Sequence, residues 1–316
     1  MYKNKKIAVV IPAYNEEKDI GQVIDRIPDY IDKIIVIDDG SNDQTASISK
    51  NKGAVVISHF KNKGVGAAFN TGVKEILKLK IDIMINIDAD NQFNPEDIEK
   101  LIIPIHNKQA DFVTASRFID KDYYPRMSNI KFLGNKFMAR FVSWLTGVRF
   151  YDVSCGFRAY SRETLQRLNL FGDFTYTQET FIDLVFKNLT IIEVPVHVRG
   201  KRKHGKSKVA CNLFQYGYRT LKIIIRTFRD YKPFRLFGYI SLFLFFIGFA
   251  LSVFLLIHYL QSGSFTPHKW AGFTAAFFIS LSFFFLLIGF ILDMFSRMRF
   301  NQEQILYELK KTKENE

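Results

Sequence analysis

The stretch Ile81–Gln92, IDIMINIDADNQ, decides how the rest of the chain is interpreted. An apolar, β-branched segment runs directly into Asp88–Ala89–Asp90, so a buried strand would end in two carboxylates one residue apart. Like charges at this spacing repel unless a cation lies between them. Residues i and i+2 at the end of a strand project to the same side, so both carboxylates can face one hard cation. The stretch predicts a divalent metal that holds a diphosphate, with a solvated turn as the alternative.

Strands and helices alternate on both sides of this stretch. Apolar runs predict strands at Ile7–Ile11, Lys33–Ile37, Ala54–Ser58, Ile81–Ile87 and Phe112–Ala115. Helical spacing and capping residues predict helices at Glu16–Ile27, Gln44–Lys50, Gly66–Leu79 and Pro95–His106. This order is typical of an α/β domain whose mostly parallel sheet is covered on both faces.

Three polar loops follow predicted strands, at Pro12–Glu16, Asp38–Ser41 and Asp88–Gln92. Ligands bind at the carboxyl ends of parallel strands, so we expect these loops to form one site, which favours the metal over a plain turn. A dinucleotide site is not expected. The glycine-rich segment Gly64–Phe69 follows the third predicted strand, whereas the dinucleotide fingerprint follows the first.

The C-terminal third of the chain contains two long apolar segments. Leu236–Leu260 and Trp270–Leu292 carry no Asp, Glu, Lys or Arg, and each exceeds the ~20 residues needed to cross a bilayer. A soluble buried helix of this length with no polar face would be unusual. We therefore expect two transmembrane helices, which could also pair with copies of themselves in a homo-oligomer.

The charge is concentrated just before these segments. Arg199–Arg235 contains twelve Lys or Arg residues and one acid, so it carries +11 of the formal net charge of +13. This distribution argues against a nucleic-acid binder and favours a basic collar at an anionic cytoplasmic leaflet. The link Gln261–Lys269 carries a single Lys, while Arg297 and Arg299 follow the second helix. We expect a plasma-membrane protein with its catalytic domain and both termini in the cytoplasm.

The chain gives two further compositional signals. The apolar run near the N-terminus is too short for a signal peptide, so export by that route is not expected. Cys155 and Cys211 are the only cysteines, which implies neither a disulfide framework nor a cysteine zinc site.

Four ordered segments resemble the GT-A glycosyltransferases of family 2: VVIPAYNEE, IIVIDDGSNDQT, NKGVGAAFNTG and INIDADNQF. Further segments, SCGFRAYSRE (Ser154–Glu163) and EVPVHVRGKRKHGKSK (Glu193–Lys208), are similar to the polyprenyl-phosphate branch, of the dolichol-phosphate-mannose-synthase type. The resemblance covers roughly residues 5–210. It implies a Rossmann-like nucleotide-diphospho-sugar transferase domain.

The resemblance implies residues for the donor side of the site. Those for the nucleotide are Pro12, Tyr14, Glu16, Asp38, Asp39, Asp88 and Ala89, with Asp38 and Asp39 not apportioned between base and ribose. Asp88, Asp90 and Gln92 would surround Mg²⁺ or Mn²⁺, with Asp90 and Gln92 as direct ligands. Arg202 and Lys208 would close over the diphosphate as a basic flap.

The resemblance also implies residues for the acceptor side. Arg117 would bind the acceptor phosphate, helped by Arg126, Ser128 or Lys131. Lys131 stands where an Arg is expected, and Lys makes a point-charge contact where Arg can bind bidentately. Asp152 is a candidate base or acceptor-orienting carboxylate, with a loop cap as the alternative.

The chemistry can be argued independently of the resemblance. Loss of a nucleoside diphosphate from a sugar leaves negative charge, which a divalent metal and fixed cations stabilise. A polyprenyl monophosphate is already ionised near neutral pH, so it needs positioning and charge neutralisation more than deprotonation. The many Lys and Arg residues, and the lack of an obvious His base, fit a phosphate acceptor.

We therefore expect an inverting hexosyltransferase that moves a sugar from GDP-mannose, UDP-glucose or another UDP-sugar to a polyprenyl (dolichyl or undecaprenyl) phosphate. The alternatives are a processive polysaccharide synthase of the same superfamily and a catalytically silent sugar-lipid binder. The expected domains are a GT-A catalytic domain (1–210), an amphipathic interfacial helix (211–233), two transmembrane helices (234–296) and a cytoplasmic tail (297–316). In the interfacial helix, Arg219, Lys222, Arg226 and Arg229 would form one basic stripe.

Overall fold

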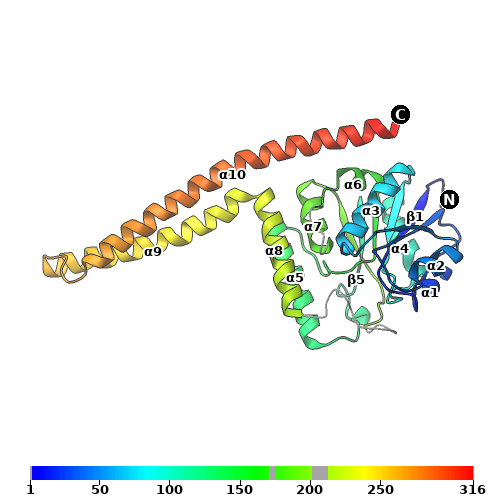
Figure 1. Cartoon of the computed structure of the whole chain (residues 1–316). Helices are drawn as coiled ribbons and strands as arrows, with labels where there is room; N and C mark the ends of the chain where they lie inside the picture. Colours follow the sequence, from blue (N-terminus) through cyan, green and yellow to red (C-terminus); the bar gives the residue numbers. More distant parts are fainter. Residues whose placement is uncertain (1, 171–175, 201–212, 316) are drawn as a thin grey trace. The chain divides into compact units, whose positions relative to one another are not determined.

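The computed structural model describes residues 2–170, 176–200 and 213–315. The chain forms two compact units, Met1–Ile224 with Leu306–Glu316, and Ile225–Ile305. The first unit holds a seven-stranded sheet in the order β3-β2-β1-β4-β6-β5-β7. The expected mostly parallel α/β fold is thus confirmed (Figure 1).

The strands of the first unit are β1 (Ile7–Ala13), β2 (Lys33–Asp38), β3 (Val55–Ser58), β4 (Ile83–Asn86), β5 (Phe112–Ser116), β6 (Arg158–Ser161) and β7 (Ile191–Pro195). Its helices up to β7 are α1 (Ile20–Asp25), α2 (Thr45–Asn51), α3 (Val65–Lys78), α4 (Ile98–His106), α5 (Asn129–Thr146), α6 (Arg162–Arg167) and α7 (Thr177–Phe186). Short 3₁₀ turns precede α4 at Pro95–Asp97 and α5 at Lys121–Tyr123. Each strand predicted up to β5 is present, with its ends shifted by a few residues.

Helices cover both faces of the sheet. On one face, Val9 of β1 and Ile85 of β4 join a buried core with Ile24 of α1 and Leu101 of α4. On the other face, Val10 of β1 meets α3, where a β-carbon at Gly72 would lie 2.5 Å from Val10 Cγ1. Apolar strands buried on both sides explain why the sequence shows continuous apolar runs here rather than alternation.

β6 was not predicted, and it is the antiparallel strand of the sheet. It pairs with β4 (Asn86 opposite Arg158) and with β5 (Thr114 opposite Arg158). The segment that leads into β6 therefore reaches the edge where β4 and β5 end. This reversal brings Asp152–Phe157 beside the loop that contains Asp88 and Asp90.

The predicted convergence of the polar loops is confirmed. β1 pairs in parallel with β2 (Ala13 opposite Asp38) and with β4 (Val10 opposite Asn86), so all three strands end at one edge. The expected geometry of the two carboxylates is wrong in one respect. β4 ends at Asn86, and Ala89 and Asp90 lie in a turn followed by Asn91 at φ +54°, so the alternation of an extended strand does not orient them.

The C-terminal part is helical. α8 (Leu213–Tyr231) lies within the range expected for the interfacial helix, and its place at an interface stays a prediction. α9 (Pro233–Ser262) and α10 (Lys269–Asn315) are long and apolar enough to span a membrane. Only 11% and 17% of their most apolar windows are buried in the chain, which is unlike a soluble core helix. The expected cytoplasmic tail is the continuation of α10.

α9 and α10 form a hairpin in which small residues allow close packing. A β-carbon at Gly248 of α9 would lie 2.7 Å from Ile279 Cγ1 and 3.0 Å from the carbonyl oxygen of Ala275. The hydroxyls of Ser241 and Ser282 are buried and 3.1 Å apart. Close backbone approach and interhelical hydrogen bonds are typical of helix pairs in lipid.

Candidate functional site

The loops after β1 and β2 are fastened to each other by hydrogen bonds. The backbone N–H of Asn15 donates to Ser41 Oγ (2.9 Å), and that of Asn42 donates to Asn15 Oδ1 (2.8 Å). The backbone N–H of Glu16 donates to Thr45 Oγ1 at 2.8 Å. These bonds shape one continuous polar rim at the carboxyl ends of β1 and β2.

The residues expected to bind the nucleotide lie along this rim. Pro12, Tyr14 and Glu16 are half-buried, whereas Asp38 is buried and accepts a hydrogen bond from the backbone N–H of Ser41 at 3.1 Å. Ala89 is buried in the core below the site, so its backbone rather than its methyl group can face a nucleotide.

Asp39 holds the turn that begins α3. Its Oδ1 accepts from the backbone N–H of Lys63 (2.9 Å), and its Oδ2 accepts from that of Gly64 (2.8 Å). Oδ1 also lies 2.7 Å from His59 Nδ1, and His59 Nε2 lies 2.9 Å from Thr71 Oγ1. His59 therefore links Asp39, in the loop after β2, to Thr71 of α3.

Asp88 lies against Gly156, in the segment that leads to β6. A β-carbon at Gly156 would lie 2.7 Å from Asp88 Oδ2 and 2.8 Å from Oδ1. The Gly156 carbonyl accepts from Asn86 Nδ2 at 2.8 Å, and Asn86 Nδ2 also donates to Tyr176 Oη at 2.7 Å. Burial, followed by the charges of Tyr160 and Asp88, raises the pKa of Tyr176 well above its ordinary value, so this phenol stays neutral.

Asp90 and Gln92 lie at the start of the next segment. Asp90 is 4% exposed, and its Oδ1 accepts from the backbone N–H of Gln92 at 3.1 Å. Gln92 Nε2 donates to the carbonyl oxygen of Arg199 (2.6 Å), and the N–H of Arg199 donates to the Gln92 carbonyl oxygen (3.0 Å). Gln92 thereby anchors the segment after β7 beside Asp90.

The donor set at this edge fits a hard divalent cation. Asp88, Asp90 and Gln92 offer oxygen atoms, and oxygen is the ligand that Mg²⁺ prefers and Mn²⁺ accepts. Because Gln92 Nε2 donates to Arg199, its Oε1 is the atom that can face a metal. Within the described residues, no three His, Cys, Asp or Glu side chains are grouped to hold a metal. Asp88, Asp90 and Gln92 could therefore supply part of the coordination of such a cation.

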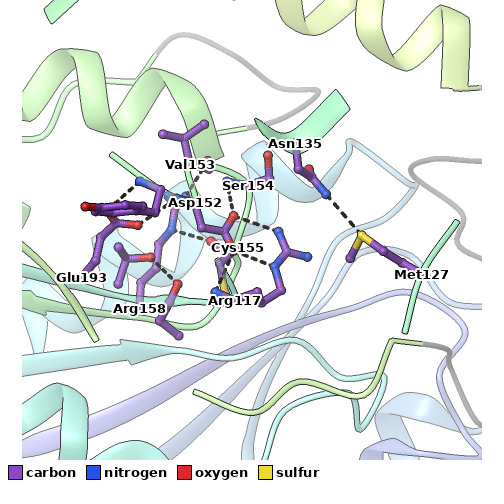
Figure 2. A network of polar contacts seen from close by, with 12 residues as sticks. Arg117, Met127, Asn135, Asp152, Val153, Ser154, Cys155, Arg158 and Glu193 are labelled. Carbon is purple, nitrogen blue, oxygen red and sulfur yellow. Dashed lines mark hydrogen bonds and ion pairs between the residues drawn. The ribbon is translucent and has the colours of Figure 1, made fainter. Parts of the chain in front are cut away.

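Arg117 and Asp152 form an ion pair at the end of β5 (Figure 2). Arg117 Nε donates to Asp152 Oδ2 at 2.6 Å, and Nη2 donates to Oδ1 at 2.8 Å. The Asp152 side chain is 0% exposed and that of Arg117 is 15% exposed. Arg117 is thus the member of the pair that reaches the surface. Both carboxylate oxygens of Asp152 accept hydrogen bonds from the guanidinium of Arg117.

Glu193 of β7 fixes the backbone around Asp152 (Figure 2). The N–H of Tyr151 donates to Glu193 Oε2 and the N–H of Asp152 donates to Oε1, each at 2.8 Å. No role was predicted for Glu193. An acid inside the apolar segment Ile191–Pro195 was the signal available for it, since an unpaired charge is disfavoured in a buried strand.

A fully buried arginine lies below this network. Arg158 donates to the carbonyl oxygens of Cys155 (2.7 Å) and Thr177 (3.0 Å). Its guanidinium also lies 5.1 Å from the ring centroid of Phe181 and 5.5 Å from that of Tyr176. Carbonyl oxygens and aromatic faces replace water around the cation. Arg158 holds the turn that presents Gly156.

The other residues expected at the acceptor phosphate lie at the start of α5. Arg126, Ser128 and Lys131 are exposed, and Ser128 caps α5 by accepting from the backbone N–H of Lys131. Gly200 lies so close to the carbonyl of Arg126 that a β-carbon would overlap it. The segment after β7 therefore passes between Gln92 and Arg126. The flap residues Arg202 and Lys208 lie outside the described residues, as does the side chain of Arg219.

α5 presents an exposed apolar row that was not predicted. Its members recur at helical spacing and are 61–72% exposed: Ile130 (72%), Leu133 (65%), Phe137 (61%) and Trp144 (64%). The helix contains Lys131, Lys136 and Arg140 and no Asp or Glu. Apolar residues flanked by cations are typical of a helix that lies at a membrane surface.

Comparison with known proteins identifies the family of this chain. The model of the family described as glycosyl transferase family 2 matches residues 8–168. A UDP-N-acetylglucosamine–dolichyl-phosphate N-acetylglucosaminyltransferase of Methanococcus voltae is 36% identical over 184 residues, which are 52% of this chain and 73% of the relative. A dolichyl-phosphate hexose transferase of Haloferax volcanii is 31% identical over 212 residues, covering 66% of this chain and 88% of the relative.

A solved structure supports the same fold. Glucosyl-3-phosphoglycerate synthase from Mycobacterium tuberculosis, in complex with Mn²⁺ and UDP-glucose, superposes with a TM-score of 0.56 and 25% sequence identity. The superposition covers 71% of this chain and 79% of that chain.

Proposed function

The chain belongs to glycosyl transferase family 2, and from this premise we propose that it transfers a sugar from a nucleoside diphosphate sugar to a polyprenyl phosphate. The relatives from Methanococcus voltae and Haloferax volcanii carry names of dolichyl-phosphate sugar transferases. The reaction would invert the configuration at the anomeric carbon.

The donor occupies the edge formed by the loops after β1, β2 and β4. The nucleoside lies along the rim of Pro12, Tyr14, Glu16 and Asp38, and the diphosphate lies beside Asp88 and Asp90. Asp88, Asp90 and Gln92 would hold Mg²⁺ or Mn²⁺, which when bound neutralises the charge that develops on the departing diphosphate. The related solved structure with Mn²⁺ and UDP-glucose supports this arrangement.

The ion pair of Arg117 with Asp152 is the observation that carries the choice of acceptor. A hydroxyl acceptor requires a general base, but both oxygens of Asp152 already accept hydrogen bonds from Arg117. An ionised phosphate requires a fixed cation, and Arg117 is held by its partner in one orientation. We assign Arg117 to the acceptor phosphate and Asp152 to the positioning of Arg117, which favours the predicted acceptor-orienting role of Asp152 over its predicted alternative as a base.

The mechanism is positioning and charge neutralisation. Arg117, with Arg126 and Lys131 at the start of α5, places the phosphate oxygen for attack on the anomeric carbon. The N-terminus of α5 adds the partial positive charge of its unsatisfied backbone N–H groups. Carbon–oxygen bond formation by the phosphate accompanies cleavage of the bond to the diphosphate, so no proton has to be removed from the acceptor.

The lipid acceptor requires that the site reaches a membrane. α9 and α10 are long and apolar enough to span one, and the basic collar before α9 favours an anionic cytoplasmic leaflet. The apolar row of α5 starts at Ile130, next to Lys131. A polyprenyl chain that remains in the bilayer can therefore present its phosphate at the start of α5.

The two alternatives are less consistent with the site. A processive synthase transfers to a sugar hydroxyl, for which Asp152 does not serve as a base. A silent sugar-lipid binder would have no need for two carboxylates at the donor edge together with an ion-paired arginine at the acceptor side.

The test is transfer by the full-length protein in detergent, with a panel of UDP- and GDP-sugars and one polyprenyl phosphate. We expect one donor to be used, and Asp90→Asn to lower turnover by about 100-fold or more because the metal loses a ligand. Asp25→Asn, which removes a carboxylate in an exposed pair with Lys52, is the matched control and should stay active. Absence of transfer from every donor, or near-normal turnover of Asp90→Asn, would contradict the proposal.

A further inference from the structure

The carboxylate of Glu193 binds two consecutive backbone N–H groups. Those of Tyr151 and Asp152 donate to different oxygens of Glu193, each at 2.8 Å (Figure 2). Two neighbouring N–H groups bound by one carboxylate fix the position and the tilt of the peptide between them. The carboxylate therefore determines where the Asp152 side chain begins.

Asp152 transmits this position to Arg117. Its Oδ2 accepts from both the backbone N–H (3.1 Å) and Nε (2.6 Å) of Arg117, and its Oδ1 accepts from Nη2 (2.8 Å). Its side chain is 0% exposed, so it cannot shift toward solvent while it keeps these bonds. The orientation of the guanidinium follows from the backbone of Asp152.

We propose that Glu193 is a positioning residue for the acceptor phosphate, and that it acts on Arg117 through the backbone and side chain of Asp152. The inference rests on the proposed function, in which Arg117 binds that phosphate. Glu193 itself touches neither substrate. Its loss would therefore weaken the use of the acceptor and spare the nucleotide sugar.

The protonation of Glu193 provides a readout. Burial raises the pKa of Glu193 to about 7, although the N–H groups of Tyr151 and Asp152 act to lower it. Above this pKa the carboxylate offers two acceptor oxygens; below it, one oxygen carries a proton and is a poor acceptor for an N–H. Both hydrogen bonds, from the N–H groups of Tyr151 and Asp152, therefore form fully only at a pH above the pKa of Glu193.

The charged groups around Glu193 do not obscure this titration. Asp152 acts on it and raises its pKa, and Asp152 is neutralised by Arg117. β7 packs against β5, which carries no titratable side chain, and against α4. The charged or titratable groups of α4 have partners elsewhere: Glu99 accepts from Tyr2, Lys100 pairs with Asp97, and His106 packs on the Tyr2 ring.

The test compares Glu193→Gln with the wild-type protein across pH. An amide has one acceptor oxygen, and its NH₂ group cannot accept from the second N–H. We expect kcat/KM for polyprenyl phosphate to fall about tenfold at pH about 8, with an unchanged KM for the nucleotide sugar. At pH about 5.5 the wild-type carboxyl is neutral, so the two proteins should converge. Titration of the acceptor phosphate is common to both proteins and cancels in their ratio.

Two further variants complete the design. Glu163→Gln removes an exposed carboxylate that pairs with Arg167, and its ratio to wild type should stay near one at every pH. Asp152→Asn should lower kcat/KM for the acceptor throughout the pH range, because it breaks the ion pair between Asp152 and Arg117 through which Glu193 acts.

The outcomes separate the inference from the proposed function. A ratio that is constant with pH, or a Glu193→Gln protein that also loses nucleotide-sugar binding, overturns the positioning role. A wild-type protein that transfers no sugar to polyprenyl phosphate contradicts the proposed function instead.

Discussion

Gly156 is the residue on which the position of the Asp88 carboxylate depends. Any side chain at this position would meet Oδ1 and Oδ2 of Asp88 within 3 Å, and the backbone on which it stands is held by Asn86 and Arg158. Neither partner can yield easily, since Asn86 and Arg158 are 0% exposed. A β-carbon would therefore displace the carboxylate rather than the turn.

We predict that Gly156→Ala lowers kcat with the nucleotide sugar about 10- to 100-fold, the usual effect of disturbing a group that orients a metal ligand. The measurement is steady-state turnover over a range of Mn²⁺ concentrations, where the variant should need more metal to reach half of its maximal rate.

Gly134→Ala is the control for this prediction. A β-carbon at Gly134, in the middle of α5, would meet no atom within 4 Å. Its turnover should match the wild type, and the added alanine should stabilise the helix by about 0.5–1 kcal/mol. A Gly156→Ala enzyme with wild-type kinetics and metal dependence would show that Asp88 is not held by this contact.

At the residue scale, the sequence predicts Asp88 and Asp90 from their residue type and from the strand before them, and Arg117 from the family resemblance. Their roles in binding stay predictions. His59 and Glu193 were not identified as positioning residues, because their roles are hydrogen bonds to partners 12–42 residues away. Such bonds depend on the register between neighbouring strands, which cannot be predicted from the sequence.

At the element scale, the antiparallel strand β6 explains why the site could be predicted only in part. Its four residues, Arg158–Ser161, are too few to give a periodic pattern, and a buried Arg opens them. If β6 is not recognised, the sequence does not show at which edge of the sheet the segment Asp152–Phe157 lies. Its contact with Asp88 and the pairing of Asp152 with Arg117 are consequences of this one reversal.

α5 allows a prediction at the same scale. If its apolar row lies at the membrane surface, Phe137→Asp should raise KM for a long-chain polyprenyl phosphate in anionic vesicles about tenfold, since a charge would be placed at the lipid boundary. KM for the nucleotide sugar should not change. The rise in KM should disappear with a short-chain, water-soluble polyprenyl phosphate, because the protein binds that acceptor from solution and not from a membrane.

Ile103→Asp is the matched control for α5. Ile103 is an exposed apolar residue on α4, with 42% of its surface accessible against 61% for Phe137. The only Lys of α4, Lys100, pairs with Asp97, and the helix also carries Glu99, so substitution of Ile103 should leave KM for both acceptors unchanged. An equal rise in KM for the short-chain and long-chain acceptors in Phe137→Asp would contradict a membrane role for this row.

At the scale of the whole molecule, the chain consists of two units whose sequences carry different kinds of information. The catalytic unit is recognisable from ordered segments that surround a site. The helical hairpin is recognisable from length and apolar composition alone, which define a span but not its direction. The direction has to be argued from charge. Arg199–Arg235, which ends in the first turn of α9, carries +11, a single Lys (Lys269) stands at the start of α10, and Arg297 and Arg299 lie toward the end of the apolar part of α10.

This asymmetry predicts that both ends of the hairpin lie in the cytoplasm and that its turn faces outward. Ser264→Cys, in the turn, should react with a membrane-impermeant maleimide in intact cells. Asn301→Cys, after the apolar part of α10, should react only once the membrane is permeabilised. Both changes would be made after Cys155 and Cys211 are replaced by Ser, since these are the only native thiols. Labelling of Asn301→Cys in intact cells would place the basic collar, and with it the acceptor phosphate, on the outer side, where cytoplasmic nucleotide sugars cannot reach the site.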